Sequence, residues 1–459
     1  LSCSCYHPED MTTCKSATRW LESRIPGSQK NWSGLCLERI ERLLKLIGNP
    51  EKSFPSVLIG GTSGKGSTAR ILSNILEEAG YKTGLHTSPH LKRVNERIQI
   101  NSKEISDKEL ANLINWIRPY VEKVGREGRF GEPSYFEIIV ALAFWRFKRE
   151  KINIASVEVG LGGTLDATNV LTPLVAIITN VSLDHTHILG NSVEKIARDK
   201  TGIIKEGIDV ITAATQKSVR EIIRKKCREK NARLTIINPD NQNSQNTDQK
   251  ETYHLLRSRQ MISHLPEFQK WNAACAVTAV KKLSRHNIEV SDTDMSKALK
   301  KTKIPARFEV INLKPKTHNL TTILDGAHNP AKMKALAEAI KSKFPNKKVT
   351  FILAAKKTKN ISGMIRRITP IAGKIIITTF KSKTDLGVNL NMDPKLIEKE
   401  IKKRKKNLPT EIMENPQGAF TKTIKESCKN DIICVTGSLY LVGELRHYII
   451  KQNSCYQIK

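Results

Sequence analysis

A glycine-rich segment near the start of the chain has the residue types of a phosphate-binding loop. It reads Gly60-Gly61-Thr62-Ser63-Gly64-Lys65-Gly66-Ser67-Thr68, follows the apolar run Val57–Ile59 and opens a helical pattern. Glycines let backbone N–H groups face an anion, a helix N-terminus adds positive potential, and the lysine can reach the outer phosphates. The alternative is a glycine-rich turn with a solvated lysine. The order of strand, loop and helix favours a nucleotide site with contacts from Gly61, Thr62, Gly64, Lys65, Gly66, Ser67 and Thr68.

Three further clusters of polar residues could contribute to the same chemistry. They are Thr87-Ser88-Pro89-His90-Leu91 with Asn95-Glu96-Arg97, Glu158-Val159-Gly160-Leu161-Gly162-Gly163, and Thr179–His187, which contains Asp184 and His185. Glu158 and the third cluster follow apolar strands, and ligands of α/β proteins bind at the carboxyl ends of strands. On residue types alone, the first cluster is explained as a loop with a capping serine. The other two predict acidic and imidazole groups near the phosphates.

Short β-branched runs alternate with longer helical patterns, which predicts parallel sheets covered by helices. The first series has expected strands at Ser56–Ile59, Ile154–Glu158, Val175–Asn180, Asp209–Thr212 and Arg233–Ile237. Its expected helices are Ser67–Ala79, Lys108–Lys123, Tyr135–Arg149, Val193–Ile204, Gln216–Glu229 and Pro266–Ser284. The Asn/Gln-rich segment Asn238–Thr252 is expected to be an exposed loop.

The alternation restarts after a Lys/Pro stretch around Lys300–Arg307, which predicts a second, smaller domain. Its expected strands are Thr321–Leu324, Val349–Leu353, Lys374–Thr379 and Ile432–Thr436. Its expected helices are Pro330–Lys341, Asn360–Arg367, Pro394–Arg404, Gly418–Cys428 and Tyr440–Ile449. We therefore expect an α/β protein with a P-loop-type parallel-sheet ATPase domain at 1–303 and a smaller Rossmann-like α/β domain at 304–459.

Composition excludes several classes of protein. The chain has 77 Lys and Arg against 45 Asp and Glu, a net charge of +32. Its densest basic run, at 402–406, lacks the interleaved aromatic residues that stack on bases, so we expect no nucleic-acid partner. No window approaches the ~18 consecutive apolar residues of a membrane span. The N-terminal residues lack the apolar stretch of a secretory signal, and the nine cysteines suit a reducing cytosol, so a cytoplasmic location is expected.

Together the motifs resemble folylpolyglutamate synthase/dihydrofolate synthase, a branch of the Mur ligase superfamily of ATP-dependent acid–amino-acid ligases. The resemblance runs from about Leu37 to about His447. It rests on motifs in a shared order: Gly61–Ser67, Thr87–Leu91, Asn95–Ile98, Glu158–Gly163, Leu165–Val170, Asp184–Thr186 and Asp325-Gly326-Ala327-His328-Asn329-Pro330. The Ser-Pro-His-Leu and Asp-Gly-Ala-His-Asn-Pro strings are the most distinctive of the folate branch.

The resemblance implies a reaction in which ATP phosphorylates a substrate carboxylate and the amine of glutamate then attacks the acyl phosphate. It implies that Lys65 holds the triphosphate and that one magnesium ion is bound by Ser67 and Glu158. A second magnesium ion would be bound by Ser88, Glu158 and His185. Lys200 aligns with a lysine that is carbamylated by CO₂ in the family. Further implied contacts are Asn272, Arg307 and Asp325 to the nucleotide, His328 and Ser438 to glutamate, and Asn95 and Arg97 to substrate.

The chain departs from the family pattern at three places. Thr164 stands where the family usually has arginine, which we expect to alter the support of that loop. Ile304-Pro305-Ala306-Arg307 replaces Trp-Pro-Gly-Arg, and Lys357-Thr358-Lys359 replaces an Asp-Lys-Asp string near the glutamate edge. The last change leaves the mode of glutamate binding open.

We therefore expect a monomeric ATP-dependent ligase that adds L-glutamate to dihydropteroate, to folate polyglutamates or to both, and we favour both. Domain closure would bring His328 and Ser438 to the phosphate loop. One alternative is another Mur-superfamily ligase, acting on a peptidoglycan precursor or a cyanophycin-like polymer, although the Ser-Pro-His-Leu string opposes the peptidoglycan branch. The other is a non-catalytic ATP-binding switch protein.

Overall fold

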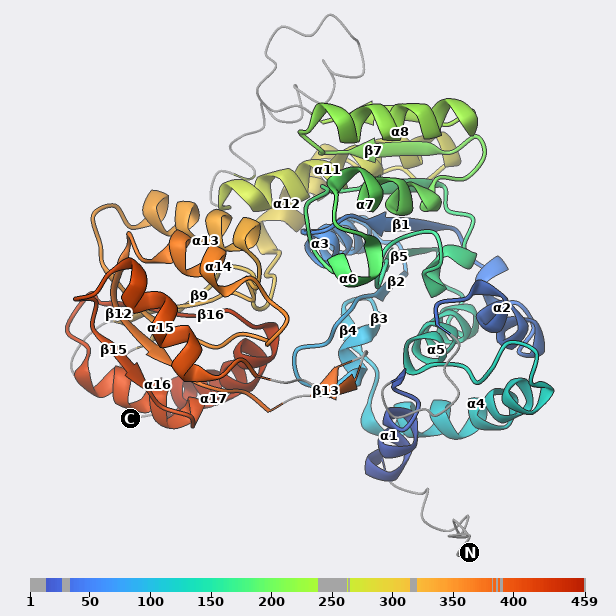
Figure 1. The fold of residues 1–459 in the computed structure, drawn as a ribbon. Coiled ribbons are helices and arrows are strands. Elements are labelled where there is room, and N and C mark those ends of the chain that lie inside the picture. Colours follow the sequence, from blue (N-terminus) through green and yellow to red (C-terminus); the bar gives the residue numbers. More distant parts are fainter. Residues whose placement is uncertain are drawn as a thin grey trace, which may run out of the picture. The chain divides into compact units, whose positions relative to one another are not determined.

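The structure is a computed structural model that describes residues 14–26, 34–237, 262, 265–313, 320–381, 383–384, 387–388 and 391–457. The predicted loop Asn238–Thr252 lies outside the described residues. The chain forms two compact units, and the main changeover between them falls between Thr302 and Lys303. The first also takes in Thr384–Gly387, and the second takes in Leu265–Phe268. Figure 1 labels the helices and strands of both units.

An eight-stranded sheet forms the centre of the first unit, in the order β4-β3-β2-β5-β1-β6-β7-β8. The strands are β1 Ser56–Gly60, β2 Thr83–His86, β3 Ile98–Ile100, β4 Lys103–Glu104, β5 Ile154–Glu158, β6 Val175–Ile178, β7 Asp209–Thr212 and β8 Arg233–Ile236. The pairs from β2 to β8 are parallel, whereas β3 is antiparallel to both β2 and β4. The expected parallel sheet therefore has an antiparallel edge.

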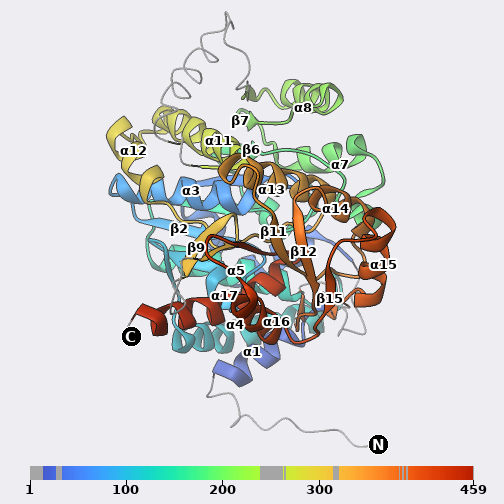
Figure 2. The ribbon, with the colours of Figure 1, turned by 90° about the vertical axis from the view of Figure 1, so that its left-hand side faces the viewer.

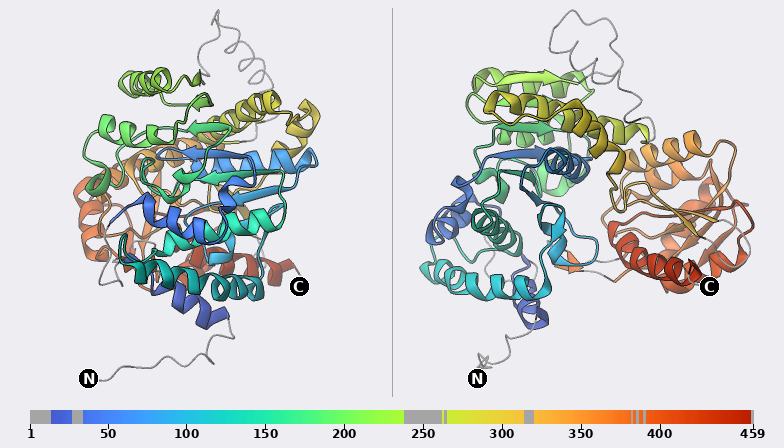
Figure 3. Two further views of the ribbon diagram at one scale, coloured as in Figure 1. Left: turned by 90° about the vertical axis from the view of Figure 1, so that its right-hand side faces the viewer. Right: turned by 180° about the vertical axis from the view of Figure 1, so that it is seen from behind.

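Helices cover both faces of this sheet. They are α1 Cys14–Glu22, α2 Leu37–Leu46, α3 Lys65–Glu78, α4 Asp107–Glu127, α5 Tyr135–Arg149, α6 Thr186–Leu189, α7 Val193–Lys200, α8 Lys217–Glu229, α11 Glu267–Leu283 and α12 Asp292–Lys301. One continuous core joins α1, α2, α4, α5, α7 and α8 to the sheet. On the other side α3 packs on β1, β2 and β5, beside α12. Figure 3 shows α3, in blue, close to the yellow α11.

Local sequence signals explain where several helices begin. Ser106, Ser134 and Ser192 cap α4, α5 and α7 by accepting a hydrogen bond from the backbone N–H three residues on. At α5 the Glu137 carboxylate also accepts from Ser134 N, which completes a capping box. The predicted helix Val193–Ile204 instead ends at Lys200 and continues as a 3₁₀ turn, Thr201–Ile203. A side chain at Gly202, within this 3₁₀ turn, would collide with Thr164, so the position has room only for glycine.

The second unit repeats the α/β plan on a smaller scale. Its six-stranded sheet has the order β15-β12-β11-β16-β10-β9, and only β9 is antiparallel to its neighbour. The strands are β9 Glu309–Leu313, β10 Leu320–Leu324, β11 Val349–Leu353, β12 Ala372–Ile377, β15 Thr410–Ile412 and β16 Ile432–Thr436. The helices are α13 Pro330–Lys343, α14 Ile361–Ile368, α15 Pro394–Arg404, α16 Pro416–Glu426 and α17 Leu439–Gln457. A short pair, β13 Lys383–Thr384 and β14 Gly387–Val388, stands apart from both sheets.

The second unit is wound on both faces. Side chains of α13, α14 and α15 form one core with the sheet. Helices α16 and α17 pack against each other and against β11 and β16. Figure 2 shows these two groups on opposite sides of the strands. Both units are thus α/β folds, and in each the loops after the parallel strands meet at one edge of the sheet.

Candidate active site

Two positions of the glycine-rich loop between β1 and α3 require glycine, because the backbone has a positive φ angle there and a Cβ atom would collide with neighbouring side chains. Gly61 has φ +127° and Gly64, the residue before α3, has φ +88°, which side chains rarely adopt. A Cβ at Gly61 would lie 2.0 Å from Thr179 Oγ1, and one at Gly64 would lie 2.1 Å from Asn272 Oδ1. The predicted nucleotide contact Asn272 is therefore packed directly against the loop. The loop ends at the N-terminus of α3, whose first residue is Lys65.

The loop is pinned to the segment that follows β6. Thr62 N donates to Asn180 O (2.8 Å), and Ser63 N donates to the Asn180 side-chain oxygen (2.9 Å). Ser182 N donates in turn to Thr62 Oγ1 (3.0 Å). Asn180 was part of a sequence motif, but its contribution to the loop could not be predicted. These bonds fix the start of the segment that carries Asp184 and His185.

Glu158 joins two of the predicted motifs. It ends β5, is 5% exposed, and its Oε2 atom accepts a hydrogen bond from Ser88 N at 2.9 Å. A Cβ added to Gly66 would lie 2.8 Å from the same oxygen, so the carboxylate lies against the phosphate loop. Ser67, the residue after Gly66, is buried, and Gln269 Nε2 lies 3.5 Å from Ser67 Oγ. Gln269 also accepts from Asn272 Nδ2 (2.9 Å), and sequence analysis did not single it out.

Three of the predicted metal ligands offer oxygen atoms as donors. The described residues contain no group of three His, Cys, Asp or Glu side chains that could hold a metal ion. Glu158 with the Ser67 and Ser88 hydroxyls supplies hard oxygen donors, which suit Mg²⁺, an ion that keeps waters and phosphates as its other ligands. His185 adopts the left-handed conformation (φ +49°) after Asp184, whose carboxylate accepts from His185 N. The binding of a metal ion by His185 stays a prediction.

Lys200, at the end of α7, is a buried lysine next to another cation. Its side chain is 4% exposed, and burial followed by the positive charge of Lys65 lowers its pKa to about 7. The carboxylates of Asp199, Asp184 and Asp166 oppose this shift. Lys65 and Lys200, far apart in sequence, are thus electrostatic neighbours. At neutral pH a large fraction of Lys200 is the free amine, the form that reacts as a nucleophile.

Thr164 holds the backbone that carries Lys200. Its N–H and its hydroxyl both donate to Asp199 O, at 3.1 and 2.9 Å. Asn169 Nδ2 donates to Thr164 O (2.9 Å), which fixes Thr164 itself. A Cβ at Gly163 would lie 2.8 Å from Lys200 Cα, so the two segments touch along their backbones. The loop after β5 therefore supports both Glu158 and Lys200.

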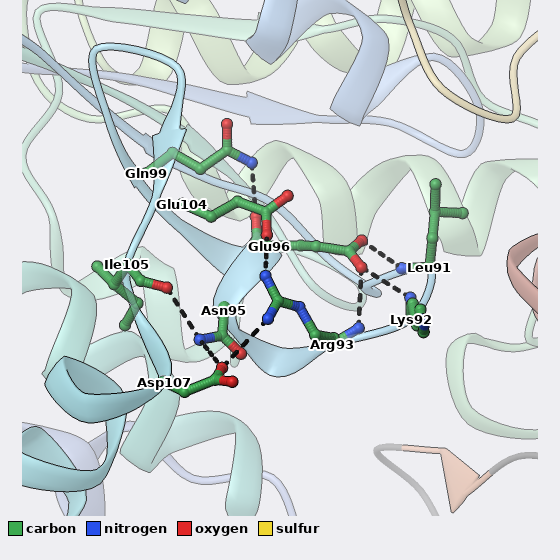
Figure 4. Close-up of polar contacts among 9 residues, drawn as sticks. All are labelled: Leu91, Lys92, Arg93, Asn95, Glu96, Gln99, Glu104, Ile105 and Asp107. Carbon is green, nitrogen blue, oxygen red and sulfur yellow. Dashed lines mark hydrogen bonds and ion pairs between the residues drawn. The ribbon is translucent and has the colours of Figure 1, made fainter. Parts of the chain in front are cut away.

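A single carboxylate organises the loop that follows Ser88. Glu96 accepts hydrogen bonds from the backbone N–H groups of Leu91, Lys92 and Arg93, at 2.7 to 2.8 Å (Figure 4). Arg93 forms ion pairs with Glu104 of β4 and with Asp107, the first residue of α4. Sequence analysis assigned no role to Glu96. Acidic side chains in loops often accept hydrogen bonds from the backbone N–H groups of nearby residues.

The predicted substrate residues Asn95 and Arg97 lie within this supporting network. Asn95 Nδ2 donates to Ile105 O and to Asp107 Oδ1, at 2.9 and 3.0 Å (Figure 4). Arg97 Nε donates to His90 Nδ1 (2.9 Å), and its guanidinium lies 5.4 Å from the Tyr135 ring centre. Both side chains are buried. Through these contacts Asn95 and Arg97 stabilise the surrounding loop. Their contact with the substrate stays a prediction.

The second unit gathers its predicted residues at the carboxyl ends of β10 and β16. Asp325 is buried, and its two oxygens accept from Phe308 N and Ala327 N, both at 2.8 Å. Burial raises the pKa of Asp325, and the positive charge of Arg307 opposes the rise. Gly437 N donates to Ala327 O (2.9 Å), which sets the loop carrying Ser438 beside the loop carrying His328. Arg307, Asp325, His328 and Ser438 therefore come from neighbouring loops.

Sequence comparison decides the family. The chain is 33% identical over 450 residues to a dihydrofolate synthase/folylpolyglutamate synthase of Bacillus subtilis, covering 95% of this chain and 99% of the relative. The chain belongs to the dihydrofolate synthase/folylpolyglutamate synthase family. Residues 309–448 also match the family model described as the C-terminal domain of dihydrofolate synthetase.

Solved structures agree with this assignment. The folylpolyglutamate synthase of Thermotoga maritima is similar with a TM-score of 0.75 and 28% identity, covering 95% of this chain and 96% of that chain. An FPGS–AMPPCP complex is similar with a TM-score of 0.74 and 25% identity, covering 95% of this chain and all of that chain. The α/β fold and the family resemblance expected from the sequence are both confirmed.

Within this family the Thr164 departure has a structural explanation. The smaller side chain uses its own N–H and hydroxyl to hold Asp199 O, so the loop is supported by short local bonds. The lysine-rich departure Lys357-Thr358-Lys359 follows β11 in the second unit. No helix of the described residues has the length and apolar character needed to cross a membrane.

Proposed function

We propose that this protein is an ATP-dependent ligase that adds L-glutamate to dihydropteroate and to folate polyglutamates through an acyl phosphate. Its membership of the dihydrofolate synthase/folylpolyglutamate synthase family supports the reaction. A similar enzyme complexed with AMPPCP supports the nucleotide. One observation carries the proposal: the carboxylate of Glu158 lies against the glycine loop at Gly66 while its neighbour Ser88 donates to it. This puts the means of holding a nucleotide and a cation in one place.

In the first step, one oxygen of the substrate carboxylate attacks the γ-phosphorus of ATP. The bond from that phosphorus to the β–γ bridging oxygen breaks, and ADP leaves. Lys65 and the backbone N–H groups of the loop balance the negative charge, which is the main demand of phosphoryl transfer. Mg²⁺ held by Ser67, Ser88, Glu158 and His185 would supply further charge neutralisation at the phosphates.

In the second step, the amine of glutamate attacks the acyl carbon, loses a proton, and phosphate leaves as the amide forms. His328 and Ser438 would bind this amino acid, so residues 304–459 would act as the glutamate-binding domain and residues 1–303 as the ATP-binding domain. Asn272, Arg307 and Asp325 would contact the base and the ribose of the nucleotide. Asn272 supports this role because its amide group already packs against the loop at Gly64.

Lys200 is proposed to carry a carbamate. A neutral amine adds to CO₂ and loses a proton, which converts a cation beside Lys65 into an anion. The lowered pKa of Lys200, due to burial and the charge of Lys65, supports this because it supplies the neutral amine near pH 7. The product would pair with Lys65, whereas the ammonium form repels it.

Phosphate release from ATP tests the proposed function. We expect release when L-glutamate is present together with dihydropteroate, dihydrofolate or tetrahydrofolate, each tested separately. Omitting either the pterin carboxylate or glutamate should reduce release to background. Release without both substrates, or none with any pterin, would contradict the ligase and would favour a nucleotide switch or a different substrate.

A further inference from the structure

We infer that Glu96 is a positioning residue whose carboxylate fixes the loop that carries Ser88, and that it thereby sets the affinity of the site for its divalent cation. The inference deepens the proposed function and rests on it. Glu96 belongs to a short 3₁₀ turn, η4 Val94–Arg97. It acts through the backbone of the loop rather than as a ligand of the metal ion, and it holds Ser88 beside Glu158, where Mg²⁺ would bind.

Three successive backbone N–H groups converge on the Glu96 carboxylate. Its Oε2 atom accepts from Leu91 N at 2.7 Å, and its Oε1 atom accepts from Lys92 N and Arg93 N, both at 2.8 Å (Figure 4). Hydrogen bonds to an ionised carboxylate are stronger than those to a neutral acceptor. Together they fix backbone dihedrals that an exposed loop would otherwise sample freely, so this single side chain orders three consecutive residues.

The residues that Glu96 holds continue directly from Ser88. Ser88 N donates to Glu158 Oε2 at 2.9 Å, which places the loop against the carboxylate that lies beside the phosphate loop. Two residues later, His90 Nδ1 accepts from Arg97 Nε at 2.9 Å. The three residues after His90 then donate to Glu96. Adjacent residues of η4 therefore fasten the loop along most of its length, starting two residues after the proposed cation ligand.

The turn η4 is itself anchored to two helices of the first unit. Asn95 Nδ2 donates to Oδ1 of Asp107, the first residue of α4, at 3.0 Å (Figure 4). Gln99 Nε2 donates to Glu96 O at 2.8 Å, and Gln99 Oε1 accepts from Arg70 Nη1 of α3 at 3.3 Å. Helix α3 begins where the phosphate loop ends. These bonds therefore connect the loop that carries Ser88 to the helix that would hold the nucleotide phosphates.

An effect on cation binding follows from the population of the ordered loop. When only a fraction of the molecules have the loop in its binding arrangement, the apparent Kd is the intrinsic Kd divided by that fraction. An ordered fraction of one tenth therefore raises the apparent Kd about 10-fold. Excess cation overcomes this loss, which distinguishes a positioning residue from a residue that the fold or the chemistry requires.

Binding of Mn²⁺ to the full chain, followed by EPR in the presence of AMPPCP, tests the inference without turnover. Mn²⁺ accepts the same kinds of oxygen ligand as Mg²⁺. In Glu96→Gln we expect the Kd of Mn²⁺ to rise about 10-fold, because one oxygen of the carboxylate becomes an NH₂ group that cannot accept a hydrogen bond. Glu96→Asp keeps both oxygens and should bind Mn²⁺ more tightly than Glu96→Gln. The Kd of AMPPCP measured in EDTA should stay within about 2-fold of wild type in both variants.

Steady-state kinetics supply a second readout and a matched control. In Glu96→Gln the Mg²⁺ concentration for half-maximal phosphate release should rise about 10-fold, whereas kcat at saturating Mg²⁺ should stay within about 2-fold. Glu104→Gln is the control. It removes an exposed ion pair with the Arg93 side chain (3.2 Å), a kind of contact that contributes little, and leaves all three backbone bonds to Glu96 in place. Its affinity for both cations should equal that of wild type.

The possible results separate this inference from the proposed function. An unchanged Kd of Mn²⁺ in Glu96→Gln, or an equal rise in Glu104→Gln, would overturn the role of Glu96 while the ligase stands. Failure of saturating Mg²⁺ to restore kcat would show a need for Glu96 in folding or chemistry, and would overturn it too. Wild-type protein without any glutamate-dependent phosphate release would instead overturn the proposed function, and this inference with it.

Discussion

Lys65→Ala should lower ligase turnover by about 10³-fold while the protein remains folded. Lys65 begins α3 directly after the glycine loop, where its ammonium group would balance the charge of the transferred phosphoryl group. Lys65 is partly exposed and does not belong to the hydrophobic core that joins α1, α2, α4, α5, α7 and α8 to the sheet, so its removal should leave the melting temperature nearly unchanged. Steady-state phosphate release with both substrates measures the effect. Lys108→Ala, an exposed lysine on α4, is the matched control and should keep full activity.

The same variant has a second, independent consequence. The charge of Lys65 helps to hold the pKa of Lys200 at about 7, so removing it should raise the pKa of Lys200. If Lys65→Ala turned over normally, the phosphate-loop assignment would be wrong. If turnover fell but the pKa of Lys200 did not move, the two lysines would not be neighbours.

Lys200→Ala should lower activity by about 100-fold, and short carboxylates such as acetate should restore part of it. The alanine leaves a space where a carbamate anion is proposed to stand, and a small carboxylate can supply the missing charge. Protein exposed to ¹³C-bicarbonate should show a carbamate signal in ¹³C NMR that Lys200→Ala lacks. Lys195→Ala, which removes an exposed lysine of the same helix, should keep both the signal and the activity.

The pH dependence follows from the depressed pKa of Lys200. Below pH 7 the buried amine is mostly protonated and does not add to CO₂, so the carbamate signal at fixed dissolved CO₂ should grow as pH rises through about 7. In the unfolded chain the pKa returns to 10.5, so between pH 7 and 10.5 the unfolded state binds more protons and Lys200 makes stability rise with pH. A signal that stayed constant from pH 6 to 8, or an indifferent Lys200→Ala, would contradict carbamylation.

Long periodic segments were predictable from the sequence because their patterns reflect burial. Strand β5 and helix α5 have the predicted bounds, since apolar runs and a Ser-x-x-Glu capping box define them locally. The antiparallel edge was not predicted, because β2 and β3 are only four and three residues long and too short to show a period. Helix α2 was also missed, although its apolar residues repeat at helical spacing.

The sequence motifs identified which residues belong to the site, but they did not indicate which of these residues contact one another. Glu158 lies close to Gly66 because β5 pairs with β1 in the sheet. The order of the strands in the sheet cannot be predicted from a local sequence pattern. The backbone next to Lys200 is held by hydrogen bonds from Thr164 to Asp199 O, and the sequence indicated only that Thr164 would alter the support of its loop. Asn95 is the opposite case, because a motif position proved to carry structural bonds.

Isotope transfer tests the central claim that the phosphate loop serves to activate a carboxylate. Dihydropteroate labelled with ¹⁸O in both carboxylate oxygens would be turned over with ATP and L-glutamate, and the phosphate analysed by mass spectrometry. We predict one ¹⁸O atom in each phosphate released, because one carboxylate oxygen leaves with the phosphoryl group when the amide forms. Phosphate without ¹⁸O, alongside normal product formation, would contradict the acyl-phosphate mechanism.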